Sequence, residues 1–176
     1  NAIQFPRIQG ADVCGRVVAV GNQVDNNLLG KRVLVEPCIR EAGGQVLDPP
    51  WYFGSECDGG FAEYTVVAAR HAHVIHSEFN DVELASFPCA YSTAENLLTR
   101  ARVTAHDVVL VTGASGGVGS AVIQLAQARG ARIIGVTTPA KSDRVLRLGA
   151  DQTLSRNEGI GQQIGDRKST RLNSSH

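Results

Sequence analysis

The sequence predicts an α/β chain in which an antiparallel β-barrel portion is followed by part of a doubly wound parallel sheet. Short β-branched runs separated by glycine and proline occupy residues 1–79, as in antiparallel sheets. A continuous apolar run at 108–112 then leads through a glycine-rich turn into an amphipathic helix, and a second apolar run follows it. Alternating strands and helices of this kind are typical of a parallel sheet.

The first part of the chain is expected to contain only strands and loops. Strands are predicted at 16–20, 31–36 and 61–67, each bounded by glycine or proline. The stretch between Cys38 and Cys57 contains a Gly-Gly pair and a Pro-Pro pair, which favours a long loop.

Helices become prominent from residue 80 onward. Asn80 or Asp81 can cap a short helix over 82–87, because their side-chain oxygens accept hydrogen bonds from free N–H groups in its first turn. Around the strand at 108–112 we expect helices at 93–101, from 118 to Gly130 and at 142–148, and a further strand at 132–137. The order of strand, glycine turn, helix, strand and helix defines a βαβα unit.

The composition is that of an ordinary globular chain and excludes several classes of protein. The chain has 176 residues with 17 basic and 17 acidic side chains, and 43% of its residues are hydrophobic. This balance gives no electrostatic reason to bind nucleic acid or a membrane surface, and no apolar run is long enough for a membrane span. The four cysteines form no Cys-x-x-Cys pair, which favours the reducing cytoplasm.

The last residues, 166–176, differ from the rest of the chain. They are polar and have neither helical nor strand periodicity. Their order resembles the forward translation of a common sequencing-library adapter, so we interpret them as a disordered, non-native tail and exclude them from the fold. Together with the absence of methionine, this tail predicts that the chain is a fragment.

The glycine-rich turn at 113–119 carries the strongest functional signal. A strand that turns directly into a helix leaves free N–H groups at the start of the helix, which attract an anion together with the helix dipole. Against the dinucleotide-binding pattern Gly-x-Gly-x-x-Gly, the chain has Ala114, Gly116 and Gly119 in the required strand–turn–helix context. We therefore predict that a pyrophosphate binds at Ser115, Gly116, Gly117, Val118 and Gly119; a tight turn without a ligand is the alternative.

The end of the second strand of this unit predicts the cofactor. An acidic residue there would bind the ribose 2′-hydroxyl of NAD, whereas a nearby cation without an acid favours the 2′-phosphate of NADP. Thr137 and Thr138 occupy this place, and Lys141 and Arg144 follow. We expect NADP, held by Thr137, Thr138 and Lys141; alternatively, Lys141 and Arg144 form only the solvated face of the next helix.

Further motifs occur along the chain in a fixed order. They comprise Gly-x-Asp-x-x-Gly-x-Val-x-x-Val-Gly at 10–21, Gly-Lys-Arg-Val at 30–33, Gly-Gly-Phe-Ala-Glu-Tyr at 59–64, Ser-Thr-Ala at 92–94 and Leu-Gly-Ala-Asp at 148–151. With the glycine turn, they make residues 1–165 resemble the medium-chain dehydrogenase/reductase family, and within it the quinone-oxidoreductase-like, zinc-type alcohol dehydrogenase-like branch.

The resemblance implies a domain organisation and an activity. Residues 1–87 would be the C-terminal part of a GroES-like substrate domain, and 88–165 the first part of a Rossmann NADP-binding domain. The whole protein would be a homodimer that transfers hydride from NADPH to a quinone, an enone or a similar carbonyl compound. Its nicotinamide would lie near Thr93, with Val118 behind the ring. Because half of the nucleotide domain would be missing, the fragment itself is expected to be inactive.

The family also divides by its use of zinc. Catalytic zinc in its alcohol dehydrogenases is held by two cysteines and the histidine of a Gly-His-Glu motif, whose last two positions are Ala11 and Asp12 here. Cys89 falls at the position of the third ligand, and the position of the first lies before Asn1. We therefore expect no metal, with Cys89 as a remnant candidate that forms a small buried residue near the nicotinamide. Only two cysteines remain in the loop after Pro37, where structural zinc would need four.

Other interpretations remain open. A zinc-dependent alcohol dehydrogenase is the nearest one, and a non-catalytic NADPH-binding relative is another. The run from Thr112 to Gly119 also fits the pattern Thr-Gly-x-x-x-Gly-x-Gly of short-chain dehydrogenases, but no later Tyr-x-x-x-Lys follows it. His71 and His73 could pair on a metal, but no nearby cysteine or carboxylate is expected to complete the set, which favours a surface strand.

Overall fold

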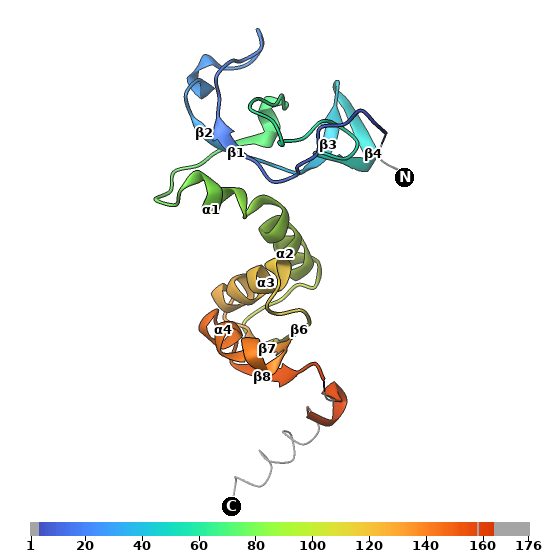
Figure 1. Cartoon of the computed structure of the whole chain (residues 1–176), viewed down its shortest axis with the longest axis vertical. Helices are drawn as coiled ribbons and strands as arrows, with labels where there is room; N and C mark the ends of the chain where they lie inside the picture. Colours follow the sequence, from blue (N-terminus) through green and yellow to red (C-terminus); the bar gives the residue numbers. More distant parts are fainter. Residues whose placement is uncertain (1–3, 158, 164–176) are drawn as a thin grey trace, which may run out of the picture. The chain divides into compact units, whose positions relative to one another are not determined.

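The computed structural model describes residues 4–157 and 159–163, so the predicted tail at 166–176 lies outside the described residues. Contacts within the chain divide it into two units, one ending at Cys89 and the other beginning at Ala90. Figure 1 shows that strands and loops dominate the first unit, while the second alternates strands and helices. An antiparallel first part and a parallel second part agree with the predicted fold class.

A three-stranded antiparallel sheet lies at the centre of the first unit. It contains β1 (Cys14–Arg16), β2 (Arg32–Val35) and β5 (Ala72–Val74), in the order β1-β2-β5. Val33 and Val35 of β2 are buried, which confirms the strand predicted at 31–36. The strand predicted at 16–20 is wrong in its bounds, because only Cys14 to Arg16 lie opposite β2 and the chain then leaves the sheet towards a 3₁₀ turn, η1 (Asn26–Leu28).

The stretch between Cys38 and Cys57 forms a β-hairpin, which corrects the prediction of a long loop. Its strands are β3 (Cys38–Ala42) and β4 (Gln45–Tyr52), which pair with each other alone. Gly43 and Gly44 make the turn with φ angles of 58° and 76°, the left-handed conformation that a two-residue hairpin turn requires at both positions. Pro49 and Pro50 are tolerated within β4 because it is an edge strand.

The strand predicted at 61–67 is absent from the structure, although its sequence alternates suitably. Phe61, Tyr64 and Val66 are exposed, and no strand is assigned to this range. The range is held at its start, where the Phe61 N–H donates to the carbonyl oxygen of Gln9 at 2.9 Å. The pattern failed because no described strand lies beside these residues to complete a ladder. After them, the 3₁₀ turn η2 (Ala69–His71) leads into β5.

Two helices follow the first sheet. The predicted short helix is α1 (Asp81–Ala85), and Asn80 is its N-cap: the Asn80 side chain accepts from the Glu83 N–H, and the Glu83 carboxylate accepts from the Asn80 N–H, both at 2.9 Å. The next helix, α2 (Pro88–Arg100), begins five residues before the predicted start at 93. Proline suits the first position of a helix, because its missing N–H would have no partner there.

The second unit is built on a parallel sheet of β6 (Val108–Val111), β7 (Arg132–Thr137) and β8 (Gln152–Ser155). The helices α3 (Gly117–Ala128) and α4 (Ser142–Arg147) connect these strands, with a 3₁₀ turn, η3 (Pro139–Lys141), before α4. The core joins Ile123 of α3, Ile133 of β7 and Val145 of α4, all fully buried. The βαβα unit is confirmed, as is Gly130 as the helix end, with φ of 76°, whereas β8 was not predicted.

Candidate functional site

The glycine turn between β6 and α3 forms the floor of the candidate site. Gly116 is the N-cap of α3, and a glycine has no side chain with which to cap the first turn of this helix. A helix start without a side-chain cap leaves its N–H groups available for an external anion.

Gly119 shows why this turn needs glycine. A Cβ added to Gly119 would lie 2.3 Å from the carbonyl oxygen of Gly113, which is too close for any side chain. Ala114, which replaces the first glycine of the pattern, is fully buried. A Cβ at Gly135 of β7 would lie 2.6 Å from Cγ1 of Val145 and 3.2 Å from the Ala114 Cβ, so the glycine on β7 makes room for both side chains. The departure from the pattern is therefore accommodated by the neighbouring strand.

A cavity of about 460 Å³ lies beside this turn, at the carboxyl ends of β6, β7 and β8. Ligands of open parallel sheets bind at this end of the strands. The residues that line the cavity carry no carboxylate: Thr112, Gly113, Ser115, Val136, Thr137, Thr138, Lys141, Arg156 and Ile160. The structure thus brings four of the predicted residues together, namely Ser115, Thr137, Thr138 and Lys141. Arg144 is exposed on α4 and is not among them.

Arg156 is the residue that the sequence analysis missed. It follows β8, and its N–H donates to the carbonyl oxygen of Thr137 at 3.0 Å, so its backbone is fixed to the end of β7. The signal for it was a basic residue just after a third strand, but β8 is short and polar and was not recognised as a strand. With Lys141, it gives the cavity two cationic side chains.

The Thr137 side chain points to a ligand in this region. Thr137 is only 4% exposed, and its hydroxyl oxygen is buried without a hydrogen-bond partner among the described residues. A buried hydroxyl without a partner is unfavourable unless another group satisfies it. Thr137 and Thr138 also line a second cavity of about 280 Å³, where the hydroxyls of Ser142 and Thr153 lie 2.6 Å apart.

Thr93 is not brought into this cavity. It is exposed on α2, next to the fully buried Ala94. The start of α2 nevertheless lies close to the glycine turn, because a Cβ added to Gly117 would lie 3.9 Å from the Cβ of Ala90. The predicted contact of Thr93 with a nicotinamide therefore stays a prediction.

Asp12, at the glutamate position of the Gly-His-Glu motif, and Cys89, at the position of the third zinc ligand, are in contact. The Cys89 N–H donates to Oδ1 of Asp12 at 2.7 Å. The Cys89 residue is exposed, so the expectation of a buried small residue is wrong, because Cys89 lies in the first turn of α2. Partial desolvation and then the negative charge of Asp12 raise the pKa of the Cys89 thiol. Within residues 4–157 and 159–163, no group of three His, Cys, Asp or Glu side chains could hold a metal ion.

The two histidines differ from the expected surface strand. His71 is buried in η2, and only His73 lies in β5. A carboxylate does approach both: Oε2 of Glu36 is 3.1 Å from Nδ1 of His71 and 3.7 Å from Nε2 of His73. The assumption that no carboxylate lies nearby is wrong, because Glu36 directly follows β2 and its N–H donates to the carbonyl oxygen of His71 at 2.8 Å.

Comparison with known proteins agrees with this architecture. Residues 1–77 match the family model of the alcohol dehydrogenase GroES-like domain. A protein of Sinorhizobium meliloti 1021, whose crystal structure carries a provisional assignment as an alcohol dehydrogenase, is 47% identical in sequence with a TM-score of 0.84. That match covers 92% of this chain and 45% of the other.

Curated relatives include two kinds of oxidoreductase. The quinone oxidoreductase of Sus scrofa is 32% identical over 88% of this chain and 42% of its own length. The NAD-dependent alcohol dehydrogenase of Saccharolobus solfataricus is 29% identical over 87% of this chain and 47% of its own length. The chain spans about half the length of the first curated relatives that it matches.

The relatives are therefore named as oxidoreductases, and this chain pairs a GroES-like domain match with a parallel-sheet unit. These similarities agree with the resemblance of residues 1–165 to the medium-chain dehydrogenase/reductase family. Among the described residues, no helix has the length and apolar character needed to cross a membrane.

Proposed function

We propose that this protein is an NADPH-dependent oxidoreductase that transfers hydride to a quinone, an enone or a similar carbonyl compound without catalytic zinc. The observation that carries the proposal is the cavity beside the glycine turn, whose lining, within the described residues, contains Lys141 and Arg156 and no carboxylate. A 2′-phosphate carries negative charge, so two cations favour NADP over NAD, whereas NAD-binding sites place an acid at this position.

The described residues fit a dinucleotide. The start of α3, which has no side-chain cap from Gly116, would hold the pyrophosphate. At Gly119 the backbone of the turn approaches so closely that position 119 has no room for a side chain. The buried hydroxyl of Thr137 would gain the hydrogen-bond partner that it lacks within the described residues. When bound, the nicotinamide supplies the hydride, and the protein supplies orientation and electrostatics. Val118 and Thr93 would lie near that ring.

The absence of catalytic zinc is supported by the residues at the corresponding positions. The Ala11 side chain has no ligand atom, and the Asp12 carboxylate accepts the Cys89 N–H. An alcohol dehydrogenase with zinc is the second candidate, because Cys89 lies at a ligand position and several relatives are named as alcohol dehydrogenases.

Binding of NADPH and NADH to the purified chain tests the cofactor. We expect NADPH to bind more tightly, and Lys141→Ala or Arg156→Ala to weaken NADPH by about tenfold each, since a hydrogen bond to a charged group contributes about 1.5–3 kcal/mol. NADH affinity should change little in both variants. Arg144→Ala is the matched control, because this exposed arginine is outside the cavity lining. Equal affinity for both dinucleotides in the wild type would contradict the NADP assignment.

Metal analysis tests the second part of the proposal. The chain is incubated with Zn²⁺, dialysed and analysed for bound metal. We expect no stoichiometric zinc and no difference between wild type and Cys89→Ser. One equivalent of zinc that is lost in Cys89→Ser would favour the alcohol dehydrogenase instead.

A further inference from the structure

The start of α2 receives a hydrogen bond from a residue that lies far away in the sequence. The first N–H groups of a helix have no partner within it, and Pro88 at the first position has no N–H at all. Cys89 is thus the first residue of the helix that can donate. Its N–H donates to Oδ1 of Asp12, which is 77 positions earlier in the sequence. By contrast, α1 is capped by its own neighbour Asn80.

The loop that carries Asp12 is held firmly on its N-terminal side. The carbonyl oxygen of Gly10 accepts the Gly60 N–H at 2.8 Å. A Cβ added to Gly59 would lie 2.3 Å from the same oxygen, so the backbone at Gly59 and the backbone at Gly10 are in direct contact. Asp12 therefore projects from a fixed backbone rather than from a free loop.

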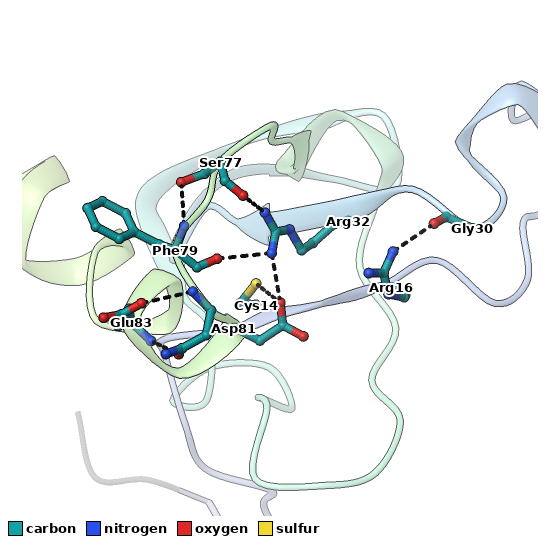
Figure 2. Close-up of polar contacts among 9 residues, drawn as sticks. Cys14, Arg16, Gly30, Arg32, Ser77, Phe79, Asp81 and Glu83 are labelled. Atoms are coloured by element: carbon teal, nitrogen blue, oxygen red, sulfur yellow. Dashed lines mark hydrogen bonds and ion pairs between the residues drawn. The ribbon is translucent and has the colours of Figure 1, made fainter.

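The C-terminal side of this loop is attached to α1. Figure 2 shows Cys14, two residues after Asp12, with its thiol 3.8 Å from Oδ1 of Asp81. Arg32 of β2 donates to the same Asp81 oxygen at 3.3 Å and to the carbonyl oxygen of Phe79 at 3.0 Å. The Arg32 guanidinium also donates to the carbonyl oxygen of Ser77. Asp12 is thus anchored on both sides before it reaches α2.

We propose that Asp12 is a positioning residue that caps α2 from a distant loop and so fixes the first turns of this helix, from Cys89 to Thr93. The cap itself is independent of the proposed function; only its importance for hydride transfer rests on that function, through Thr93. A carboxylate at a helix N-terminus is favoured by both the hydrogen bond and the helix dipole. Asp12 acts through α2 and has no assigned contact with substrate.

Amide hydrogen exchange in the purified chain tests this proposal. Asp12→Ala should speed exchange of the Cys89 amide by about fivefold, the equivalent of a typical N-cap of about 1 kcal/mol. Asp12→Asn should restore most of the protection, because the amide oxygen still accepts a hydrogen bond. Asp107→Ala is the matched control: this carboxylate accepts the Thr104 N–H at the same 2.7 Å, and its loss should leave α2 unchanged.

Two outcomes would overturn the proposal. Unchanged exchange at Cys89 in Asp12→Ala would show that the carboxylate does not cap the helix. Faster exchange of equal size in β2, β5 and α2 would show that Asp12 supports the first unit as a whole and does not place α2. Amide hydrogen exchange is measured without a cofactor. A failure of the proposed cap is therefore distinguishable from a failure of the proposed NADPH binding.

Discussion

Asp151 and Ile133 are joined by two hydrogen bonds. The Ile133 N–H donates to Oδ2 of Asp151 at 2.6 Å, and the Asp151 N–H donates to the carbonyl oxygen of Ile133 at 2.9 Å. The Leu-Gly-Ala-Asp motif thereby fixes the beginning of β8 to β7. Gly149 precedes this contact with φ of 114°, a conformation that disfavours any other residue.

Asp151→Ala should therefore destabilise the second unit. The Ile133 N–H belongs to a fully buried residue, and leaving such a donor without a partner costs about 1–3 kcal/mol. Urea unfolding, followed by circular dichroism, measures this loss. Asp151→Asn keeps an acceptor and should lose less stability, whereas equal losses in both variants would contradict the assigned hydrogen bond.

Gly119→Ala should abolish dinucleotide binding. The new Cβ would lie 2.3 Å from the Gly113 carbonyl oxygen, which forces the glycine turn open. Gly21→Ala is the matched control, since this glycine lies outside the glycine turn and a Cβ added to it would meet nothing within 4 Å. Fluorescence titration with NADPH measures both variants, and undiminished binding by Gly119→Ala would contradict the role assigned to the turn.

The Asp12 charge should control the reactivity of Cys89. Because desolvation and then Asp12 raise the thiol pKa, less reactive thiolate is present at neutral pH. Asp12→Asn removes the charge and should shift the pH profile of Cys89 alkylation to lower pH. Peptide-level mass spectrometry with iodoacetamide measures this shift. The profiles of Cys38 and Cys57 should not move, and a shift shared by all cysteines would indicate general unfolding.

Asp107 should make the turn before β6 sensitive to acid. Its carboxylate accepts the Thr104 N–H at 2.7 Å and the Thr104 hydroxyl at 2.9 Å, and these bonds, the backbone one first, lower its pKa. Because the folded pKa lies below the unfolded one, the contribution to stability is present above the unfolded pKa and is lost as pH falls through the folded value. Carboxyl NMR titration should show a higher Asp107 pKa in Thr104→Val, whereas an unchanged value would contradict this account.

Local patterns were sufficient for the parts of the fold that depend on neighbours in sequence. The helix cap at Asn80, the helix end at Gly130 and the βαβα unit all follow from short-range chemistry. The strand expected at 61–67 failed because a strand needs a partner, which the alternation of its own residues cannot supply. The hairpin was missed because Gly43 and Gly44 were interpreted as a loop signal although they also favour a tight turn.

Only part of the candidate site was predictable, because only some of its residues follow strands that local patterns identify. Ser115, Thr137, Thr138 and Lys141 follow two strands that the sequence identifies, and the carboxyl ends of parallel strands meet at one edge. Arg156 required recognition of β8, whose polar residues give no apolar run. The hydrogen bond between Asp12 and Cys89 joins positions 77 residues apart, and no local sequence pattern predicts such a contact.

The hairpin also has a consequence for self-association. An edge strand with unpaired N–H and carbonyl groups is a template for another β-strand, and among the described residues β4 pairs only with β3. Pro49 and Pro50 supply no N–H at two consecutive positions of β4, so an approaching strand would find a gap in the ladder there. The same two residues that suggest a loop in the sequence thus protect this edge of the folded chain against aggregation.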